Sequence, residues 1–258
     1  MRCLPVLALL LFPLAVLAGQ PCRFQAPRTL SADLTGVRSV RIEVHSQDVH
    51  VLGSGTATGL SGEGRACASS RAGLDALQVT SRREGDQLVV DVGGDAGGFH
   101  FDLFGSSYAY LDLSLQLPAS MPVTLDVGSG DAAAAGLQQL AAYVGSGDLH
   151  VRQIAGKFSA SVGSGDIDAN DVGSLALDAV GSGDFGVAGV RGDARIGSIG
   201  SGDVGLHGVG GSVQADTLGS GDLTVRDVQG GFSLGTKGSG DVDYSGVKGP
   251  VSVPRDDD

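Results

Sequence analysis

The residues with the greatest chemical potential are seven serine–aspartate pairs held in one recurring string, Gly-Ser-Gly-Asp. The string begins at Gly128, Gly145, Gly163, Gly181, Gly200, Gly219 and Gly238. A serine near a carboxylate could act as a nucleophile, but neither the G-x-S-x-G motif nor a histidine at a regular offset accompanies it. A hydrolase also needs one activated residue, whereas this string has seven copies. The pattern predicts a structural turn and no catalytic residue.

The aspartates of the string could alternatively hold cations. They are Asp131, Asp148, Asp166, Asp184, Asp203, Asp222 and Asp241. Calcium-binding β-rolls use G-G-x-G-x-D-x-U-x twice per turn, whereas here the aspartate follows glycine directly and the motif occurs once per repeat. The five histidines are scattered, and no Cys/His pair has ligand spacing. We expect these side chains to cap backbone N–H groups, with a calcium ladder as the alternative, and we predict no metal site and no cofactor.

A carbohydrate-active enzyme is the second alternative, because parallel β-helices often carry polysaccharide-cleaving sites. Such a site needs carboxylates clustered on one face, alone or with Arg or Lys. Residues 166–178 are rich in aspartate, but these aspartates follow the repeat and lack a singular partner. A non-enzymatic protein is therefore favoured.

The spacing of the string is 17, 18, 18, 19, 19 and 19 residues. Apolar residues alternate after each aspartate and again before the next string, which predicts strand, turn, strand, turn in every repeat. One such unit cannot bury its apolar face alone, so successive units must stack. The sequence predicts an all-β fold, a parallel β-solenoid of about 18–19 residues per coil. An antiparallel sandwich is the alternative fold. The stretch from Ala132 to Ala142 has helix propensity, but we assign it to one β-strand coil of the solenoid.

Composition limits the partners. The formal net charge is −12, and residues 128–258 contain 17 Asp and no Glu. Nucleic acids and anionic membrane surfaces both require clustered Lys and Arg, so neither is an expected partner.

Four segments are predicted along the chain. Residues 1–18 have a basic start, a short apolar stretch and small residues before a cleavage point after Ala18, as in a signal peptide. Residues 19–127 carry irregular coils, insertions and a cap, with a hairpin turn at 83–87; residues 128–253 form the regular solenoid, and 254–258 an acidic tail. No later run is long enough to span a membrane. The residues before Cys22 do not form a lipobox.

Two groups of residues could carry structure or binding in the irregular half. Cys22 and Cys67 remain after cleavage and favour one disulfide in an oxidising compartment, with two unpaired core residues as the alternative. The glycine-rich stretch from Gly93 to Gly105 and the residues just after it gather five of the twelve aromatics. They could stack on sugar rings or dock a partner, or simply cover the end of the core. These five aromatic residues are Phe99, Phe101, Phe104, Tyr108 and Tyr110.

The strings VGSGD and GSGD-Φ-x-Φ follow a strand at Leu111 to Leu117 and the phrase Leu-Pro-Ala-Ser-Met-Pro-Val at 117–123. In these features residues 35–253 resemble the bacterial putative adhesin family, also described as the auto-transporter adhesin head or GIN-type domain. The resemblance implies an exported, single-stranded and right-handed parallel β-helix, and it brings no catalytic residues. No segment after Val253 could form a translocation barrel. We expect a periplasmic protein, or a secreted or surface one, that binds an unknown protein or glycan of the cell envelope.

Overall fold

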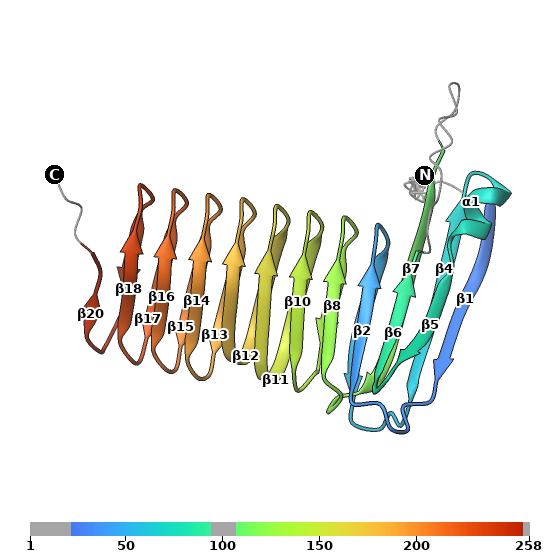
Figure 1. The fold of residues 1–258 in the computed structure, drawn as a ribbon, viewed down its shortest axis with the longest axis horizontal. Helices are drawn as coiled ribbons and strands as arrows, with labels where there is room; N and C mark the ends of the chain where they lie inside the picture. Colours follow the sequence, from blue (N-terminus) through green and yellow to red (C-terminus); the bar gives the residue numbers. More distant parts are fainter. Residues whose placement is uncertain (1–21, 94–106, 255–258) are drawn as a thin grey trace, which may run out of the picture.

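The computed structural model describes residues 22–93 and 107–254. These residues form a β-solenoid of stacked parallel strands, which confirms the predicted fold class (Figure 1). The only helix in the described ranges is α1 (Arg71–Ala76). No helix in those ranges is long and apolar enough to cross a membrane.

Each regular coil contributes one strand to each of two sheets. The coils from residue 185 onward contain β13 (Phe185–Val190), β14 (Ala194–Ile199), β15 (Val204–Val209), β16 (Val213–Leu218), β17 (Leu223–Val228), β18 (Phe232–Lys237), β19 (Val242–Ser245) and β20 (Val251–Ser252). Strands β13, β15, β17 and β19 pair in parallel in the first sheet, and β14, β16, β18 and β20 pair in the second. Phe185 lies opposite Val204, so the repeat length in the sequence is the register of the sheet.

The preceding coils continue the same two sheets. They contain β8 (Val123–Val127), β9 (Ala132–Ala135), β10 (Leu140–Val144) and two long strands, β11 (Asp148–Val162) and β12 (Asp166–Val180), which each run through both sheets. The alanine-rich stretch forms strands as predicted. Its helix propensity is overridden because Ala132, Ala134 and Ala142 are buried against neighbouring coils.

The irregular half adds two more coils in an order that differs from the chain. They are built from β2 (Ser39–Val44), β3 (Asp48–Ser54), β6 (Gln87–Val92) and β7 (Ala109–Pro118). Strand β2 pairs with both β6 and β8, and β3 pairs with both β7 and β9. The first coil of the chain is therefore enclosed between two later ones.

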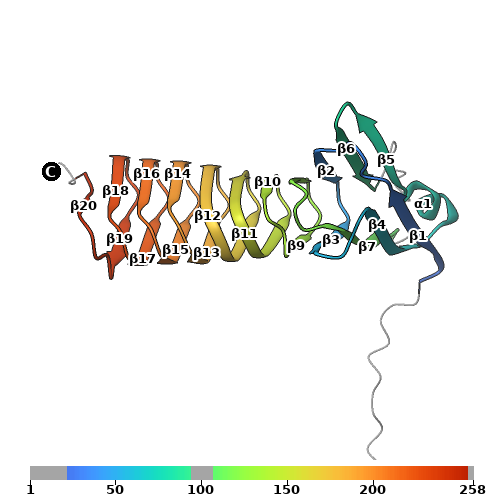
Figure 2. The same cartoon turned by 90° about the horizontal axis from the view of Figure 1, so that it is seen from below.

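Antiparallel strands cover the N-terminal end of the stack. Strand β4 (Leu60–Ala68) pairs antiparallel with β7 and with β1 (Phe24–Ala32). Strand β5 (Val79–Glu84) forms a hairpin with β6, and Gly85 has a φ of 64° in its turn. Figure 2 shows that this end, which also carries α1, is broader than the regular coils. The parallel stack of coils therefore ends at β7, and the antiparallel strands β4 and β1 cover its last coil.

The GSGD turns are the corners where successive coils approach most closely. The second glycine of every string is buried, and a Cβ atom placed on it would overlap backbone atoms of the coil before it. The opposite corner places a residue at positive φ five positions after each GSGD aspartate. These residues are Gly136, Gln153, Asp171, Gly189, Gly208, Asp227 and Gly246.

Candidate binding sites on the solenoid surface

The GSGD aspartates form one exposed row along the solenoid, which we call the aspartate row. Parallel registers align each aspartate with the next, as in the pairing of Asp148 with Asp166. The row continues into the irregular half, because Asp48 lies opposite Asp112 and the β3–β9 register aligns Asp48 with Asp131. Asp48 ends the string His-Ser-Gln-Asp at 45–48, an imperfect copy of the GSGD repeat, whereas no such string contains Asp112.

Backbone N–H groups occupy carboxylate oxygens of this row. The Oδ1 atom of Asp166 accepts a hydrogen bond from the N–H of Asp184 at 2.9 Å. The same bond joins each later pair of neighbouring coils, ending with Asp241 N–H and Asp222 Oδ1 at 3.0 Å. No group of three or more His, Cys, Asp or Glu side chains in residues 22–93 and 107–254 is arranged to hold a metal ion. These hydrogen bonds cap the turns from Asp166 to Asp241, and each one offsets part of the repulsion between stacked carboxylates.

Asp48 is the member of the row with a perturbed acidity. Burial raises its pKa above the usual 3.8, and the carboxylates of Asp131 and Asp112 raise it further. The N–H of Asp131 hydrogen-bonds to Asp48 and opposes this shift only in part. The ionised side chain is therefore less favourable in the folded protein than in the unfolded chain.

The substitution Asp48→Asn is expected to stabilise the protein at pH 7 by less than about 1 kcal/mol, since the side chain stays largely exposed. The amide oxygen can still accept the Asp131 N–H, while the charge is removed. Because its folded-state pKa is raised, the contribution of Asp48 to wild-type stability falls as pH rises above 3.8 through that pKa. Urea denaturation at pH 7 and pH 3 measures this, and the gain should vanish at pH 3. An equal gain at both values would contradict the electrostatic cause.

The two described tyrosines of the predicted aromatic group lie at the N-terminal end of the stack. Their ring centroids are 6.3 Å apart. The hydroxyl of Tyr108 accepts the N–H of Arg23 at 3.1 Å, and the Tyr110 hydroxyl lies 3.4 Å from Cys22 Sγ. Phe99, Phe101 and Phe104 lie outside the described residues, so this group stays a prediction.

The two cysteines meet beside these tyrosines. A disulfide joins Cys22 to Cys67, whose Cα atoms are 5.6 Å apart. Cys67 is buried in β4 and lies opposite Gln25 of β1 and Tyr110 of β7. The bond thus ties the segment before β1 to the centre of the antiparallel cap.

A second site lies on the second sheet, where strands far apart in the sequence bring charged side chains together. The registers place Asp91 of β6, Glu43 of β2, Asp126 of β8 and Tyr143 of β10 in one outward row. Arg41 lies two residues before Glu43 on β2 and also points outward, because side chains alternate between the faces of a strand.

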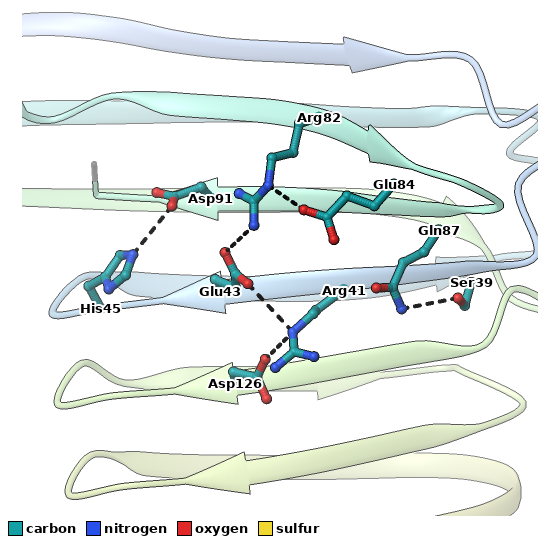
Figure 3. Close-up of polar contacts among 9 residues, drawn as sticks. All are labelled: Ser39, Arg41, Glu43, His45, Arg82, Glu84, Gln87, Asp91 and Asp126. Atoms are coloured by element: carbon teal, nitrogen blue, oxygen red, sulfur yellow. Dashed lines mark hydrogen bonds and ion pairs between the residues drawn. The ribbon is translucent and has the colours of Figure 1, made fainter. Parts of the chain in front are cut away.

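Two arginines pair with Glu43 and Asp126 of this row, and His45 Nε2 lies 3.5 Å from Asp91 Oδ2 (Figure 3). Arg41 Nε lies 2.6 Å from Asp126 Oδ2 and 3.5 Å from Glu43 Oε1. The other oxygen of Glu43 accepts a hydrogen bond from Arg82 Nη2 at 3.2 Å, and Arg82 also binds Glu84. Burial raises the pKa of Asp126 above its usual value, although Arg41 partly opposes that shift. The atoms that meet, Arg41 Nε and Asp126 Oδ2, are buried, whereas the rest of both side chains is partly exposed to solvent.

A shallow groove runs beside this network along the first glycines of the GSGD turns. We call it the tyrosine groove. It is lined by Arg41, Glu43, Val44, His45, Asp126, Val127, Gly128, Tyr143, Val144, Gly145, Ser161, Val162 and Gly163. The glycines have no side chains, so the groove is open along the turns. Tyr143 points away from the solenoid interior and has 51% of its surface exposed.

Tyr143 stands where the charged part of this row ends and a run of small side chains begins. The register aligns it with Ser161, and the following positions hold Ala179, Ser198, Thr217 and Thr236. Tyr143 was not predicted as a site residue from the sequence, although a signal was present. It stands two positions before a GSGD string, where later repeats have small side chains. Its neighbours Arg41 and Glu43 had no comparable signal.

Comparison with known proteins supports the fold but not a family. No family model and no curated protein matches the sequence. Among solved structures, a putative lipid binding protein from Parabacteroides distasonis ATCC 8503 has a TM-score of 0.52 and 15% identity, covering 90% of this chain and 97% of that chain. A putative adhesin from Bacteroides fragilis NCTC 9343 has a TM-score of 0.51 and 12% identity, covering 92% and 100%. At these identities the similarity shows that the chain shares the fold of these bacterial proteins.

Proposed function

We propose that this protein is an exported, non-enzymatic scaffold of the adhesin type. The outer faces of the solenoid would bind a component of the bacterial cell envelope. Export is supported by the signal-peptide pattern of residues 1–18 and by the disulfide, which persists in oxidising compartments. The periplasm is the proposed location. The fold it shares with a protein named a putative adhesin agrees with this role.

The observation that carries the proposal is the packed interior of the solenoid. Valine, leucine, isoleucine, alanine and phenylalanine side chains fill the space between the two sheets, and Phe158, Phe185 and Phe232 are fully buried there. An interior packed this closely cannot admit a ligand such as an acyl chain. Recognition must therefore use the outer faces, and the tyrosine groove is where the regular surface changes.

The geometry gives less support to the enzyme alternative. Asp126 combines a raised pKa with a second carboxylate, Glu43, in the same row. However, both side chains are held by Arg41, so neither presents an unpaired carboxylate to a substrate.

Cosedimentation of the purified protein with bacterial cell-envelope fractions tests the proposal. We expect saturable binding that unlabelled protein competes away, with no release of reducing sugar from envelope polysaccharides. The melting temperature should change by less than about 1 °C between EDTA and millimolar calcium, because a site stabilising by 1 kcal/mol would shift it by about 2–4 °C. Absence of saturable binding, measurable turnover, or a large calcium-dependent rise in melting temperature would each contradict the scaffold.

A further inference from the structure

We infer that the tyrosine groove is a glycan-binding site, in which a pyranose ring stacks on Tyr143 while its hydroxyl groups bind Asp126, Glu43 and Arg41. This inference rests on the proposed function and names the class of its ligand.

The first support is the position of Tyr143. An exposed tyrosine face leaves apolar area in water, and the ring offers a flat apolar surface with a polar rim. The side chains next to it are small: Ala141 precedes it on the same face of β10, and Ser161 lies beside it on β11. A ring-shaped ligand can therefore approach the tyrosine face without displacing a bulky neighbour.

The second support is the spacing of the polar groups. Asp126 is one strand away from Tyr143, and Glu43 is two strands away. Strands in a sheet lie about 4.8 Å apart, so the row spans roughly 10 Å from the tyrosine to Glu43. A disaccharide has comparable length. One sugar could stack on Tyr143 while the next reaches the network around Arg41.

The third support is the charge balance of the network. Arg41 pairs with both Asp126 and Glu43, and Arg82 also pairs with Glu43. A cationic ligand would gain little from carboxylates that are already paired, and an anionic one would meet an acidic surface. A sugar hydroxyl both donates and accepts hydrogen bonds, so it can bind carboxylate oxygens and guanidinium N–H groups that are already engaged in ion pairs.

The same features disfavour a protein partner. The buried centres of protein interfaces are depleted in charged residues and gather several apolar anchors. Here one aromatic ring stands beside an ionic network, and glycines line the turn edge of the groove. Hydroxyl groups can replace the water around those ions, whereas an apolar protein surface would leave them unsatisfied.

The test begins with an array of oligosaccharides built from neutral hexopyranoses and N-acetylated hexosamines. The glycan that binds best is then titrated calorimetrically against the wild type and three variants. Tyr143→Ala should weaken binding about tenfold or more, and Tyr143→Phe should stay within about threefold because stacking needs the ring and not the hydroxyl. Tyr244→Ala is the matched control. Tyr244 is 49% exposed in β19, where its ring packs on Phe232 near the C-terminal end of the stack, and its removal should leave the affinity unchanged.

The outcomes separate this inference from the proposed function. Failure of every glycan to bind, equal affinity of Tyr143→Ala and wild type, or an equal loss in Tyr244→Ala would overturn the glycan site. If the array is negative but the protein still cosediments with envelope fractions, the scaffold stands with a ligand of another class. If cosedimentation also fails, both are wrong. Thermal melting should show Tyr143→Ala folded like the wild type, since the side chain is half exposed.

Discussion

Replacing Gly183 with alanine is expected to destabilise the protein by about 3 kcal/mol or more, at or above the upper end of the usual cost of overpacking. Gly183 is the second glycine of its GSGD string and is buried at the corner of the coil. A Cβ atom there would overlap the carbonyl oxygen of Gly165 in the preceding coil. Backbone atoms of two paired coils cannot give way independently, so the change must separate the coils and strain their hydrogen bonds.

Gly205→Ala is the matched control for this experiment. Gly205 also lies in the repeat, within β15, but a Cβ atom added to it would meet no atom within 4 Å. Alanine should leave stability unchanged or raise it by up to about 1 kcal/mol, because it restricts the unfolded chain. Urea denaturation followed by circular dichroism measures both variants. Equal stability of the two would show that the GSGD glycines are not required by steric exclusion.

Loss of the Cys22–Cys67 bond is the second change with a large expected effect. The two residues are 45 positions apart, and closing a loop of that length restricts the unfolded chain by about 4 kcal/mol. Strand β1 has no fully buried residue and, among the described strands, pairs with β4 alone. It is held to the cap by this ladder, by the disulfide and by Arg28, which donates to the carbonyls of Leu74 and Leu77. We expect Cys22→Ser to speed amide hydrogen exchange in residues 24–32 about a hundredfold or more.

The effect should stay within the cap. Stability in a solenoid is built from contacts between neighbouring coils, so exchange in residues 185–199 should not change. Dithiothreitol should reproduce the exchange pattern of Cys22→Ser in the wild type and have no further effect on the variant. Unchanged exchange of β1 in reduced wild-type protein would mean that the ladder with β4 suffices to hold it.

Much of the regular half could be predicted from sequence because its determinants repeat locally. Each GSGD string marks a corner that only glycine can occupy, and the alternating residues on either side mark the buried face of a strand. The same logic correctly assigned Ala132 to Ala142 to strands, since the register of the repeat outweighs helix propensity.

In the aspartate row and the tyrosine groove, the residues that could be predicted from the sequence are again those that recur with the repeat. The seven GSGD aspartates were visible as a set in the sequence, and their alignment follows directly from the coil period. Asp112 joins them only because β7 pairs with β3, a strand more than fifty residues earlier. Repetition reveals residues that recur with the period, whereas a residue outside the period is placed by its pairing partner.

The sequence by itself determined the coil, its length, its corners and the side chains that fill its interior, because each of these is encoded within about 19 residues. The tertiary structure alone decided which coils are neighbours. Strand β2 lies between β6 and β8, and this placement brings Arg41 and Glu43 beside Asp126 and Tyr143. The physical reason is that a parallel sheet edge accepts any strand with matching register, so the choice among partners depends on how the whole chain closes.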